Sequence, residues 1–221
     1  MDRRAAPTLL LTRPEPDSGR LAALLPGMAA LVSPILRIVP VAHDRARLDA
    51  AEGLVFTSGH AVAAAGAGRG RPAFCVGPRT AQLAGAAGFR VIEGPGDAEG
   101  LRDLVAGSAL RLLHPHGRHL ARDLPVEGVV VYDQIPQDLS PAALRLLAGA
   151  APVVLPVMSP RSATLLAGMA GAARAPLWLA AISPAALEGW TGRQDRRTVA
   201  AAPRIEALAA AIGAMCGVEQ S

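Results

Sequence analysis

The clearest regularity in the sequence is a series of short apolar runs, each followed by a small polar or Pro/Gly-containing loop and an Ala- and Leu-rich amphipathic stretch. We predict strands at Thr8–Thr12, Gly53–Thr57, Ala73–Val76, Arg90–Ile92, Leu110–His114, Val129–Tyr132, Pro152–Met158, Leu177–Ile182 and Thr198–Ala200. Intervening segments such as Asp17–Leu25, Arg79–Ala87 and Arg204–Met215 space their apolar residues as helices do. Apolar strands that alternate with helices are typical of parallel sheets covered on both faces. The pattern therefore predicts an α/β fold.

The strand–helix units also repeat along the chain. The segment that begins at Gly53 resembles the one that begins at Val153, so that Ser58 matches Ser159. Further matches pair Pro78 with Pro184, Glu99 with Glu206 and Leu10-Leu-Thr-Arg-Pro with Leu112-Leu-His-Pro-His. The offsets stay near roughly 100 residues, a period that indicates duplicated domains rather than a solenoid of short repeats. We therefore expect two similar parallel-sheet lobes.

Two extended, β-branched segments bounded by proline fall outside this repeat, at Ser33–Val41 and Gly128–Pro136. They lie where the chain would cross between the lobes. We therefore predict a discontinuous lobe one from residues 1–33 plus 137–221, a contiguous lobe two from 42–128, and crossing strands at 34–41 and 129–136. Two crossing strands would form a two-stranded β-ladder hinge. The cleft between the lobes would then be the place for a ligand.

Composition narrows the class of protein. With 51% hydrophobic residues among 221, the chain has enough apolar surface to form a core, which excludes a disordered polymer. All 22 basic residues are arginine, and the net charge of +4 fits codon bias as well as a mild attraction to acidic ligands. The two cysteines lie far apart in the sequence, and we find neither a signal-like N-terminus nor a long apolar span. We therefore predict a soluble, cytoplasmic protein without nucleic-acid or membrane partners.

Small polar residues stand where several predicted strands end and helices begin. In an open parallel sheet these positions face one crevice, and the N–H groups at helix N-termini favour anions such as carboxylates. The alternative is plain helix capping by serine and threonine. The candidate anion-binding residues are Thr12, Thr57, Ser58, Gly77, Thr80, Ser159, Arg161, Ser162 and Ser183.

Other motifs mainly exclude function classes. The glycine-rich stretches miss the GxGxxG spacing, a P-loop needs a lysine that the chain lacks, and no GxSxG is present, which disfavours nucleotide cofactors and hydrolase templates. His114, His116 and His119 lie close together, but no carboxylate or thiolate pattern accompanies them, so we expect no metal site. We interpret this segment as a polar strand-end loop, in which His114 lines the cleft and a helix starts near Arg118.

Tyr132 is the only tyrosine in the chain and lies beside Asp133 on the second crossing segment. It could simply cover the hinge. A phenol in a cleft could also donate a proton to a leaving group.

Several motifs together resemble the uroporphyrinogen-III synthase family. They run in order nearly end to end: Leu9–Pro14, Ser33-Pro-Ile-Leu, Val55-Phe-Thr-Ser, Val76-Gly-Pro-Arg-Thr-Ala, Val131-Tyr132, Met158-Ser-Pro-Arg-Ser-Ala, Ala181-Ile-Ser-Pro-Ala and Ala202-Pro-x-x-Glu-Ala-Leu. The resemblance implies two α/β lobes joined by a β-ladder. It also implies a cofactor-free lyase of heme and tetrapyrrole biosynthesis that cyclises hydroxymethylbilane, which carries eight carboxylates, to uroporphyrinogen III with loss of water and inversion of ring D.

The same resemblance implies roles for single residues. Tyr132 matches the proton donor, Ser58 and Thr80 match polar positions of the middle lobe, and Ser159, Ser162 and Arg13 match positions of the other. We further expect a monomer that receives its substrate from hydroxymethylbilane synthase.

Two departures from the family pattern bear on activity. Ser183-Pro-Ala185-Ala186 lacks a hydroxyl that relatives often carry, and Asp133 places a negative charge beside the proposed acid. A competing hypothesis is therefore a catalytically degenerate paralogue that binds an acidic tetrapyrrole or other anion. A third, a protein binding a sugar phosphate or nucleotide, is disfavoured by the failed glycine motifs.

Overall fold

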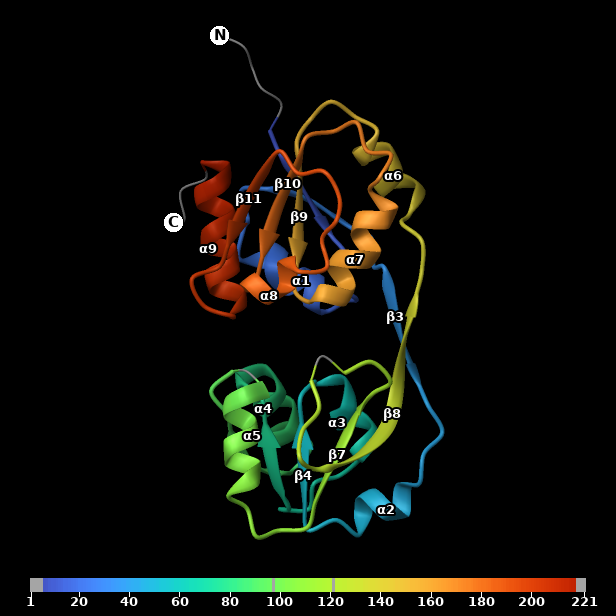
Figure 1. Ribbon diagram of the computed structural model, residues 1–221, viewed down its shortest axis with the longest axis vertical. Coiled ribbons are helices and arrows are strands. Elements are labelled where there is room, and N and C mark those ends of the chain that lie inside the picture. The colour runs from blue at the N-terminus through green and yellow to red at the C-terminus, as the bar shows by residue number, and fades with distance from the viewer. Residues whose placement is uncertain (1–5, 97, 121, 218–221) are drawn as a thin grey trace. The chain divides into compact units, whose positions relative to one another are not determined.

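The computed structural model describes residues 6–96, 98–120 and 122–217, and it has the predicted α/β class (Figure 1). Its strands form a five-stranded and a six-stranded sheet, and adjacent strands within each sheet are parallel wherever their register is defined. The chain divides into unit 1, Met1–Arg37 with Pro136–Ser221, and unit 2, Ile38–Ile135. The α/β prediction is confirmed.

Unit 1 contains the five-stranded sheet in the order β11-β10-β9-β1-β2. Its strands are β1 Thr8–Leu11, β2 Ala29–Val32, β9 Val153–Val157, β10 Leu177–Ala181 and β11 Arg196–Val199. Its helices are α1 Asp17–Ala23, α6 Pro141–Leu147, α7 Pro160–Met169, α8 Pro184–Leu187 and α9 Ile205–Cys216.

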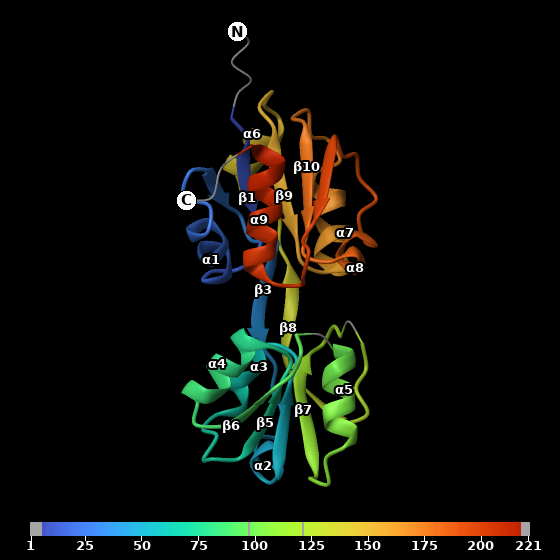
Figure 2. The same cartoon turned by 90° about the vertical axis from the view of Figure 1, so that its left-hand side faces the viewer.

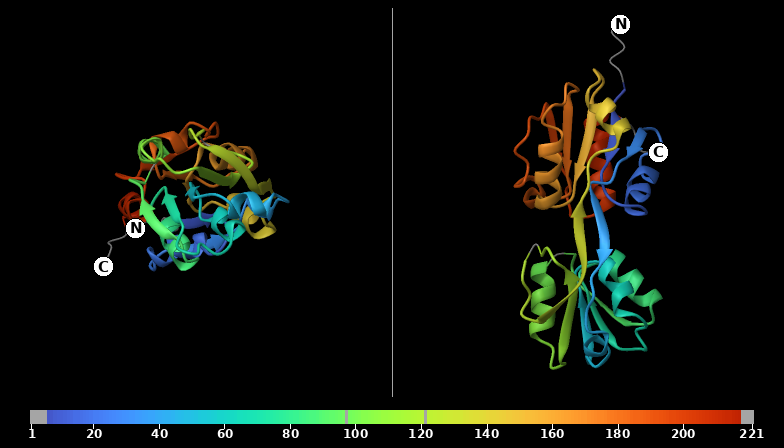
Figure 3. Two further views of the ribbon diagram at one scale, coloured as in Figure 1. Left: turned by 90° about the horizontal axis from the view of Figure 1, so that it is seen from below. Right: turned by 90° about the vertical axis from the view of Figure 1, so that its right-hand side faces the viewer.

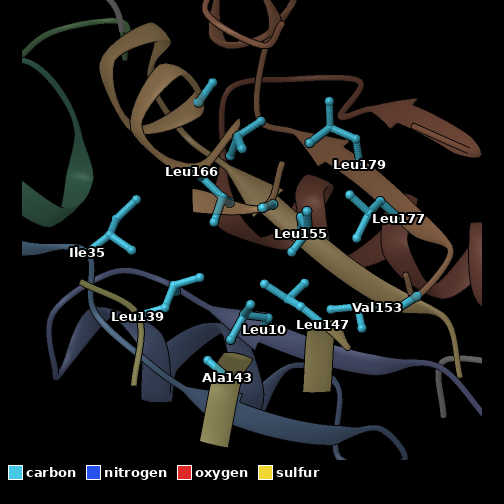
Figure 4. Packing of buried hydrophobic residues seen from close by; sticks show 14 of the residues in the cluster. Leu10, Ile35, Leu139, Ala143, Leu147, Val153, Leu155, Leu166, Leu177 and Leu179 are labelled. Carbon is cyan, nitrogen blue, oxygen red and sulfur yellow. The ribbon is translucent and has the colours of Figure 1, made fainter. Parts of the chain in front are cut away.

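Two apolar clusters enclose this sheet because its central strands are apolar on both sides. Leu9 and Leu11 pack with α1 and α9, whereas Leu10 packs with α6, α7 and α8. Figure 2 shows α1 and α9 on one face of the sheet and α7 on the other. In Figure 4, Leu10 lies among residues of β9 and β10 and of the helices α6 and α7. Since successive strand residues point to opposite faces, the Leu-Leu-Leu run contributes to both clusters.

Unit 2 contains most of the six-stranded sheet, whose order is β3-β8-β7-β4-β5-β6. The strands are β3 Leu36–Pro40, β4 Gly53–Phe56, β5 Pro72–Cys75, β6 Arg90–Glu93, β7 Leu112–Gly117 and β8 Glu127–Pro136. The helices are α2 Arg45–Asp49, α3 His60–Ala65, α4 Pro78–Ala86 and α5 Ala98–Ala106.

The two faces of this sheet are again covered by different helices. Leu54 and Phe56 pack with α2, α3 and α4, and Val55 packs with α5 on the other face (Figure 2). The ring of Phe56 meets that of Phe89 edge-on, with centroids 5.4 Å apart. Each apolar cluster is therefore built from residues of one unit only.

Strands β3 and β8 carry the chain between the units and are neighbours in the sheet order (Figure 3). Near one end, Gln137 N–H donates to the Ile35 carbonyl over 3.0 Å, and near the other, Val41 N–H donates to the Val131 carbonyl over 3.0 Å. The hinge and the cleft remain predictions.

The strand order of the two sheets reflects the repeat in the sequence. β9 matches β4, β10 matches β5, and β1 matches β7, and these pairs occupy equal places in β11-β10-β9-β1-β2 and β6-β5-β4-β7-β8. The helices show the same correspondence. In unit 1, α7 and α8 pack in one apolar cluster, as α3 and α4 do in unit 2. α9 and α5 each pack in the cluster on the opposite face of their own sheet. By this alignment β2 is the counterpart of β8.

Three local expectations were wrong or incomplete. The His114-Pro-His-Gly segment is not a loop, because β7 continues to Gly117 with every residue buried. Among the described residues 118–120 and 122–126 no helix follows, so the helix expected near Arg118 is absent. β2 was not predicted, since Ala29 and Ala30 are exposed and lack the apolar pattern of a buried strand.

No described helix combines the length and apolar character that a membrane crossing requires.

Candidate functional site

In each unit the two central strands separate near their carboxyl ends. β1 pairs with β9 only through Thr8 and Leu9, and β4 pairs with β7 only through Gly53 and Leu54. These are also the places where the strand order changes direction along the chain, since β4-β5-β6 and β7-β8 run to opposite sides. In open α/β sheets ligands bind in the crevice outside such a switch point.

A hydrogen bond joins the separated strands of unit 2. Thr57, directly after β4, has its Oγ1 2.9 Å from His114 Nε2 on β7. The His114 ring is buried, and its centroid lies 4.8 Å from that of His116, whose Nδ1 is 2.7 Å from the Gly117 carbonyl. Burial and the neighbouring His116 lower the pKa of His114 to about 4. The imidazole is consequently neutral at pH 7 and offers a carboxylate no charge.

Tyr132 on β8 is buried, with 6% of its surface exposed. Its ring lies against the backbone of Gly117 on β7, where a Cβ would lie 2.5 Å from Cε2 of the tyrosine. The ring also meets His60 edge-on, with centroids 5.8 Å apart. Burial raises the pKa of the Tyr132 phenol, and the polar groups of Ser58 and of the Gly117 backbone act in the opposite direction. The phenol therefore stays protonated at neutral pH, as a proton donor must be.

The negative charge of Asp133 is balanced locally. Its Oδ2 accepts a hydrogen bond from Arg118 Nε over 2.9 Å, and its Oδ1 accepts one from Gln134 N–H over 2.7 Å. Desolvation alone would raise the pKa of Asp133, but the hydrogen bonds from Arg118 and Gln134 and the charges of Arg118 and His119 lower it. Adjacent strand residues point to opposite faces, so this carboxylate and the Tyr132 phenol are directed apart.

The remaining candidates of unit 2 belong to the start of α4. Gly77 is the N-cap residue and supplies no side-chain cap, and Thr80 is buried in the first turn. Arg79 donates to Gln82 Oε1 over 2.8 Å on the exposed side of the helix. The backbone N–H groups of this turn thus have no serine or threonine cap from position 77.

In unit 1 the separated strands are again joined by a side chain. Arg13, after β1, places Nη1 3.0 Å from the sulfur of Met158, which follows β9, and Nη2 2.5 Å from Asp17 Oδ2. Ser18 donates to the Arg13 carbonyl over 2.6 Å. Thr12 beside it is buried, and its carbonyl accepts from Ile35 N–H. Since Asp17 already pairs with Arg13, an anionic ligand would have to share this guanidinium.

The serines after β9 and β10 cap helices. Ser159 Oγ accepts from Ser162 N–H over 3.2 Å at the start of α7, and the Ser159 and Ser162 hydroxyl oxygens lie 2.9 Å apart. Ser183 Oγ accepts from Ala186 N–H over 3.4 Å at the start of α8. Arg161 lies half-buried in the first turn of α7. Capping is thus one demonstrated role of Ser159 and Ser183, and anion binding by them remains a prediction.

The predicted residues therefore form two groups, each at the carboxyl ends of one sheet. Unit 1 holds Thr12, Arg13, Ser159, Arg161, Ser162 and Ser183, and unit 2 holds Thr57, Ser58, Gly77, Thr80, His114 and Tyr132. Sequence reasoning missed Gly117 and His60, both in contact with Tyr132, and no local motif marks either one. Among the described residues, no three His, Cys, Asp or Glu side chains gather as metal ligands.

The chain is similar to known proteins both in sequence and in structure. A family model described as uroporphyrinogen-III synthase HemD matches residues 21–210. Uroporphyrinogen-III synthetase from Helicobacter pylori 26695 is similar in structure, with a TM-score of 0.62, 14% identity, and coverage of 95% of this chain and 99% of its own. A mutant uroporphyrinogen III synthase from the extremely thermophilic bacterium Thermus thermophilus gives a TM-score of 0.51 at 14% identity, over 97% and 100% of the two chains. No curated protein sequence matched the chain.

Proposed function

The chain belongs to the uroporphyrinogen-III synthase family, and from this premise we propose that it cyclises hydroxymethylbilane to uroporphyrinogen III. The family consists of lyases of porphyrin biosynthesis. The observation that carries the proposal is the family match across residues 21–210, which spans strands of both units.

The proposed reaction begins with loss of the hydroxyl group on ring A. The phenol of Tyr132 gives its proton to that oxygen, the carbon–oxygen bond breaks with its electron pair leaving on the new water, and the pyrrole nitrogen stabilises the resulting azafulvene cation. Ring D attacks through its substituted carbon to give a spiro intermediate, which fragments and recloses with ring D inverted. The final deprotonation returns one proton to the phenolate, so the net change is loss of one water.

Positioning is the main demand of this reaction. Cyclisation without an enzyme gives the non-inverted isomer, so the protein must bring ring D to ring A through the other carbon. The substrate has eight carboxylates, and the polar groups at the two switch points are suited to them: the Arg13 guanidinium and the first turns of α4 and α7. We propose that both groups of residues bind carboxylates of the substrate.

No step of this scheme changes an oxidation state or requires an electron sink beyond the pyrrole nitrogens. We therefore propose that the enzyme works without a cofactor. We also propose that it acts as a monomer and accepts hydroxymethylbilane as hydroxymethylbilane synthase releases it, since that linear product cyclises spontaneously.

The deciding experiment is a coupled assay. Hydroxymethylbilane is generated in situ by its synthase, this protein is added, and the oxidised products are resolved by chromatography into uroporphyrin isomers I and III. Isomer III in proportion to the protein added supports the proposal. Isomer I alone, with the folded state verified by circular dichroism, would reject the enzyme and favour a protein that binds tetrapyrroles without turnover.

A Tyr132→Phe variant then tests the proton donor. The variant should lose most of its turnover while KM changes little, because the ring is retained and only the hydroxyl is removed. A wild-type rate would exclude Tyr132 as the acid without affecting the family assignment.

A further inference from the structure

We propose that Gly117 is a positioning residue for Tyr132. Together with a register shift between β7 and β8, the glycine lets the phenol ring lie on the face of the sheet that carries α3. The catalytic consequence rests on the proposed function, in which Tyr132 is the proton donor. The packing of the ring on Gly117 does not rest on it and can be tested by itself.

The register shift between β7 and β8 lies directly at Tyr132. His116 is paired with Val130, but the next residue of β7, Gly117, is paired with Tyr132. β8 therefore advances by two residues where β7 advances by one, and Val131 is the extra residue. An extra residue in one strand of a pair changes the direction of the side chains that follow it.

The apolar cluster on the α3 face shows this change of direction. Val129, Val131 and Tyr132 all belong to that cluster. Val129 and Val131 are two positions apart, as residues on one face of a strand are, but Val131 and Tyr132 are neighbours and would point to opposite faces of a regular strand. Without the shift, the tyrosine ring would point to the face that carries α5. With it, the ring meets that of His60 at the start of α3, with centroids 5.8 Å apart.

Gly117 provides the space that this direction of the ring requires. Residues paired in neighbouring strands project from the same face of a sheet, so a side chain at position 117 would be directed at the Tyr132 ring. A Cβ there would lie 2.5 Å from Cε2, 2.6 Å from Cζ and 2.9 Å from the hydroxyl oxygen of the tyrosine. All three atoms belong to the hydroxyl end of the ring. Even the methyl group of alanine would therefore displace the phenol.

The backbone conformation gives no other reason for a glycine at this position. Gly117 lies in a strand whose residues are all buried, and its φ is not positive. Among the described residues, the glycines with positive φ are Gly66, Gly70, Gly88, Gly96 and Gly217. The contact with the tyrosine ring thus accounts for the glycine. A ring held between the backbone of β7 and His60 keeps its hydroxyl in one place, which is what a proton donor requires.

The packing is tested by a cycle of four proteins: the wild type, Gly117→Ala, Tyr132→Leu and the double variant. Leucine keeps apolar bulk but lacks the three atoms that a Cβ at 117 would meet. Gly117→Ala should lower the urea midpoint of unfolding when the tyrosine is present, and should leave the midpoint unchanged or raise it in the Tyr132→Leu background. An equal loss in both backgrounds overturns the proposal. If Gly117→Ala alone does not fold, the double variant should, and its failure to fold where Tyr132→Leu folds also overturns it.

A matched control is Gly53→Ala. Gly53 begins β4, and a Cβ there would lie 2.8 Å from Cδ2 of Leu112 on β7. This close approach is to the same strand as that of Tyr132 to Gly117, but it lies at the amino end of β7. Any change that Gly53→Ala makes in the urea midpoint should therefore be the same with Tyr132 and with Tyr132→Leu.

The single tyrosine also gives a spectroscopic signature of its own position. Replacing tyrosine by 3-fluorotyrosine throughout the protein labels this one ring for fluorine NMR. The resonance should shift in Gly117→Ala and keep its place in Gly53→Ala. An unchanged resonance in folded Gly117→Ala would show that the ring does not lie on position 117 and would overturn the proposal.

Kinetics test the positioning role. Gly117→Ala should lower kcat by about a hundredfold with little change in KM, since a displacement of about 1 Å can cost that much. In the Tyr132→Phe background, where the hydroxyl is already gone, the same substitution should leave the remaining kcat unchanged. An equal loss of kcat in both backgrounds would mean that Gly117 acts only through the strand pair, which overturns the positioning role. The urea midpoints and the fluorine resonance need no turnover, so they decide the packing even if the coupled assay yields no isomer III.

Discussion

The imidazole of His114 is buried beside that of His116, and this position makes its protonation costly. Its Nε2 lies 2.9 Å from Thr57 Oγ1, and the two rings lie 4.8 Å apart. Burial first, and His116 second, lower the pKa of His114 from 6.5 to about 4. We therefore interpret the Thr57–His114 hydrogen bond as a link between β4 and β7 formed by a neutral imidazole, because burial disfavours the charged form.

A pH dependence of stability follows. Between pH 6.5 and pH 4 the unfolded chain binds the His114 proton and the folded chain does not, so the stability from this group is complete above pH 6.5 and is lost as the pH falls toward 4. The full loss is on the order of 3 kcal/mol. Urea unfolding across this range measures it. His114→Gln, which keeps a hydrogen-bonding group without a proton to bind, should flatten the dependence, and an unchanged dependence would contradict the assignment.

The two cysteines should be poor nucleophiles in the folded protein. Burial, aided by the charge of Glu93, raises the pKa of Cys75 to about 11, and burial raises that of Cys216 although Arg196 opposes it. Since the thiolate is the reactive form, a thiol-specific reagent at neutral pH should react slowly with the native chain and quickly in denaturant. Rapid labelling of Cys75 under native conditions would contradict this expectation.

At the scale of elements, the N-caps offer a way to separate structure from binding. Ser159 caps α7 in the way that Ser140 caps α6, where Ser140 Oγ accepts from Ala143 N–H over 3.2 Å. Ser159 follows a strand at the switch point, whereas Ser140 belongs to a helix that precedes β9. Only Ser159 is among the candidate anion-binding residues.

Replacing either serine with alanine should therefore cost about 1 kcal/mol of stability, the usual value of a cap. Ser159→Ala should in addition raise KM in the coupled assay, and Ser140→Ala should not. Equal KM values for both variants would leave capping as the whole role of Ser159. Urea denaturation and steady-state kinetics provide the two measurements.

The apolar strands were predictable because burial on both faces leaves a continuous signal. Leu9, Leu10 and Leu11 alternate between two clusters, so no polar residue interrupts the run. β7 was misjudged because Pro115 and Gly117 are typical of turns. Proline is tolerated there because the register pairs between β7 and β4 end at Leu113, before position 115.

Part of the candidate site was also predictable. The strand-end residues were found because parallel topology places them at one edge of each sheet, and Tyr132 was found as a unique phenol on a crossing segment. Gly117 and His60 were not, since their contacts with Tyr132 depend on the register between distant segments. β2 could have been predicted as the counterpart of β8 in the repeat. The local pattern around Ala29 and Ala30 did not indicate a strand, because both residues are exposed.

At the scale of the whole molecule, each unit has its own core. Each of the four apolar clusters lies within a single unit, two in unit 1 and two in unit 2. Unit 2 is a continuous stretch, Ile38–Ile135. The chain enters and leaves unit 2 along the adjacent strands β3 and β8. Among the described residues, the apolar clusters of unit 2 therefore contain none from unit 1.

We predict that residues 38–135 fold when expressed alone. The fragment should unfold cooperatively, with a free energy on the order of 5 kcal/mol, as expected for a domain of this size. Circular dichroism during urea denaturation would measure it, and an unfolded fragment would show that the cores depend on each other. A fragment of residues 60–157, of equal length but cut across both units, is the matched control and should not fold.

The two sheets share one spatial order of strands, but the chain passes through that order from a different starting strand in each unit. In unit 1 the strands from β9 onward are β9, β10 and β11. If the two ends of the chain were joined, β1 and β2 would follow them. This order corresponds strand by strand to β4, β5, β6, β7 and β8 of unit 2. The strand orders of the two units are thus related by a circular permutation. The two polar groups at the switch points therefore occupy corresponding places in the two sheets, so that the position held by Arg13 in unit 1 has its counterpart on the sheet of unit 2 that carries Tyr132.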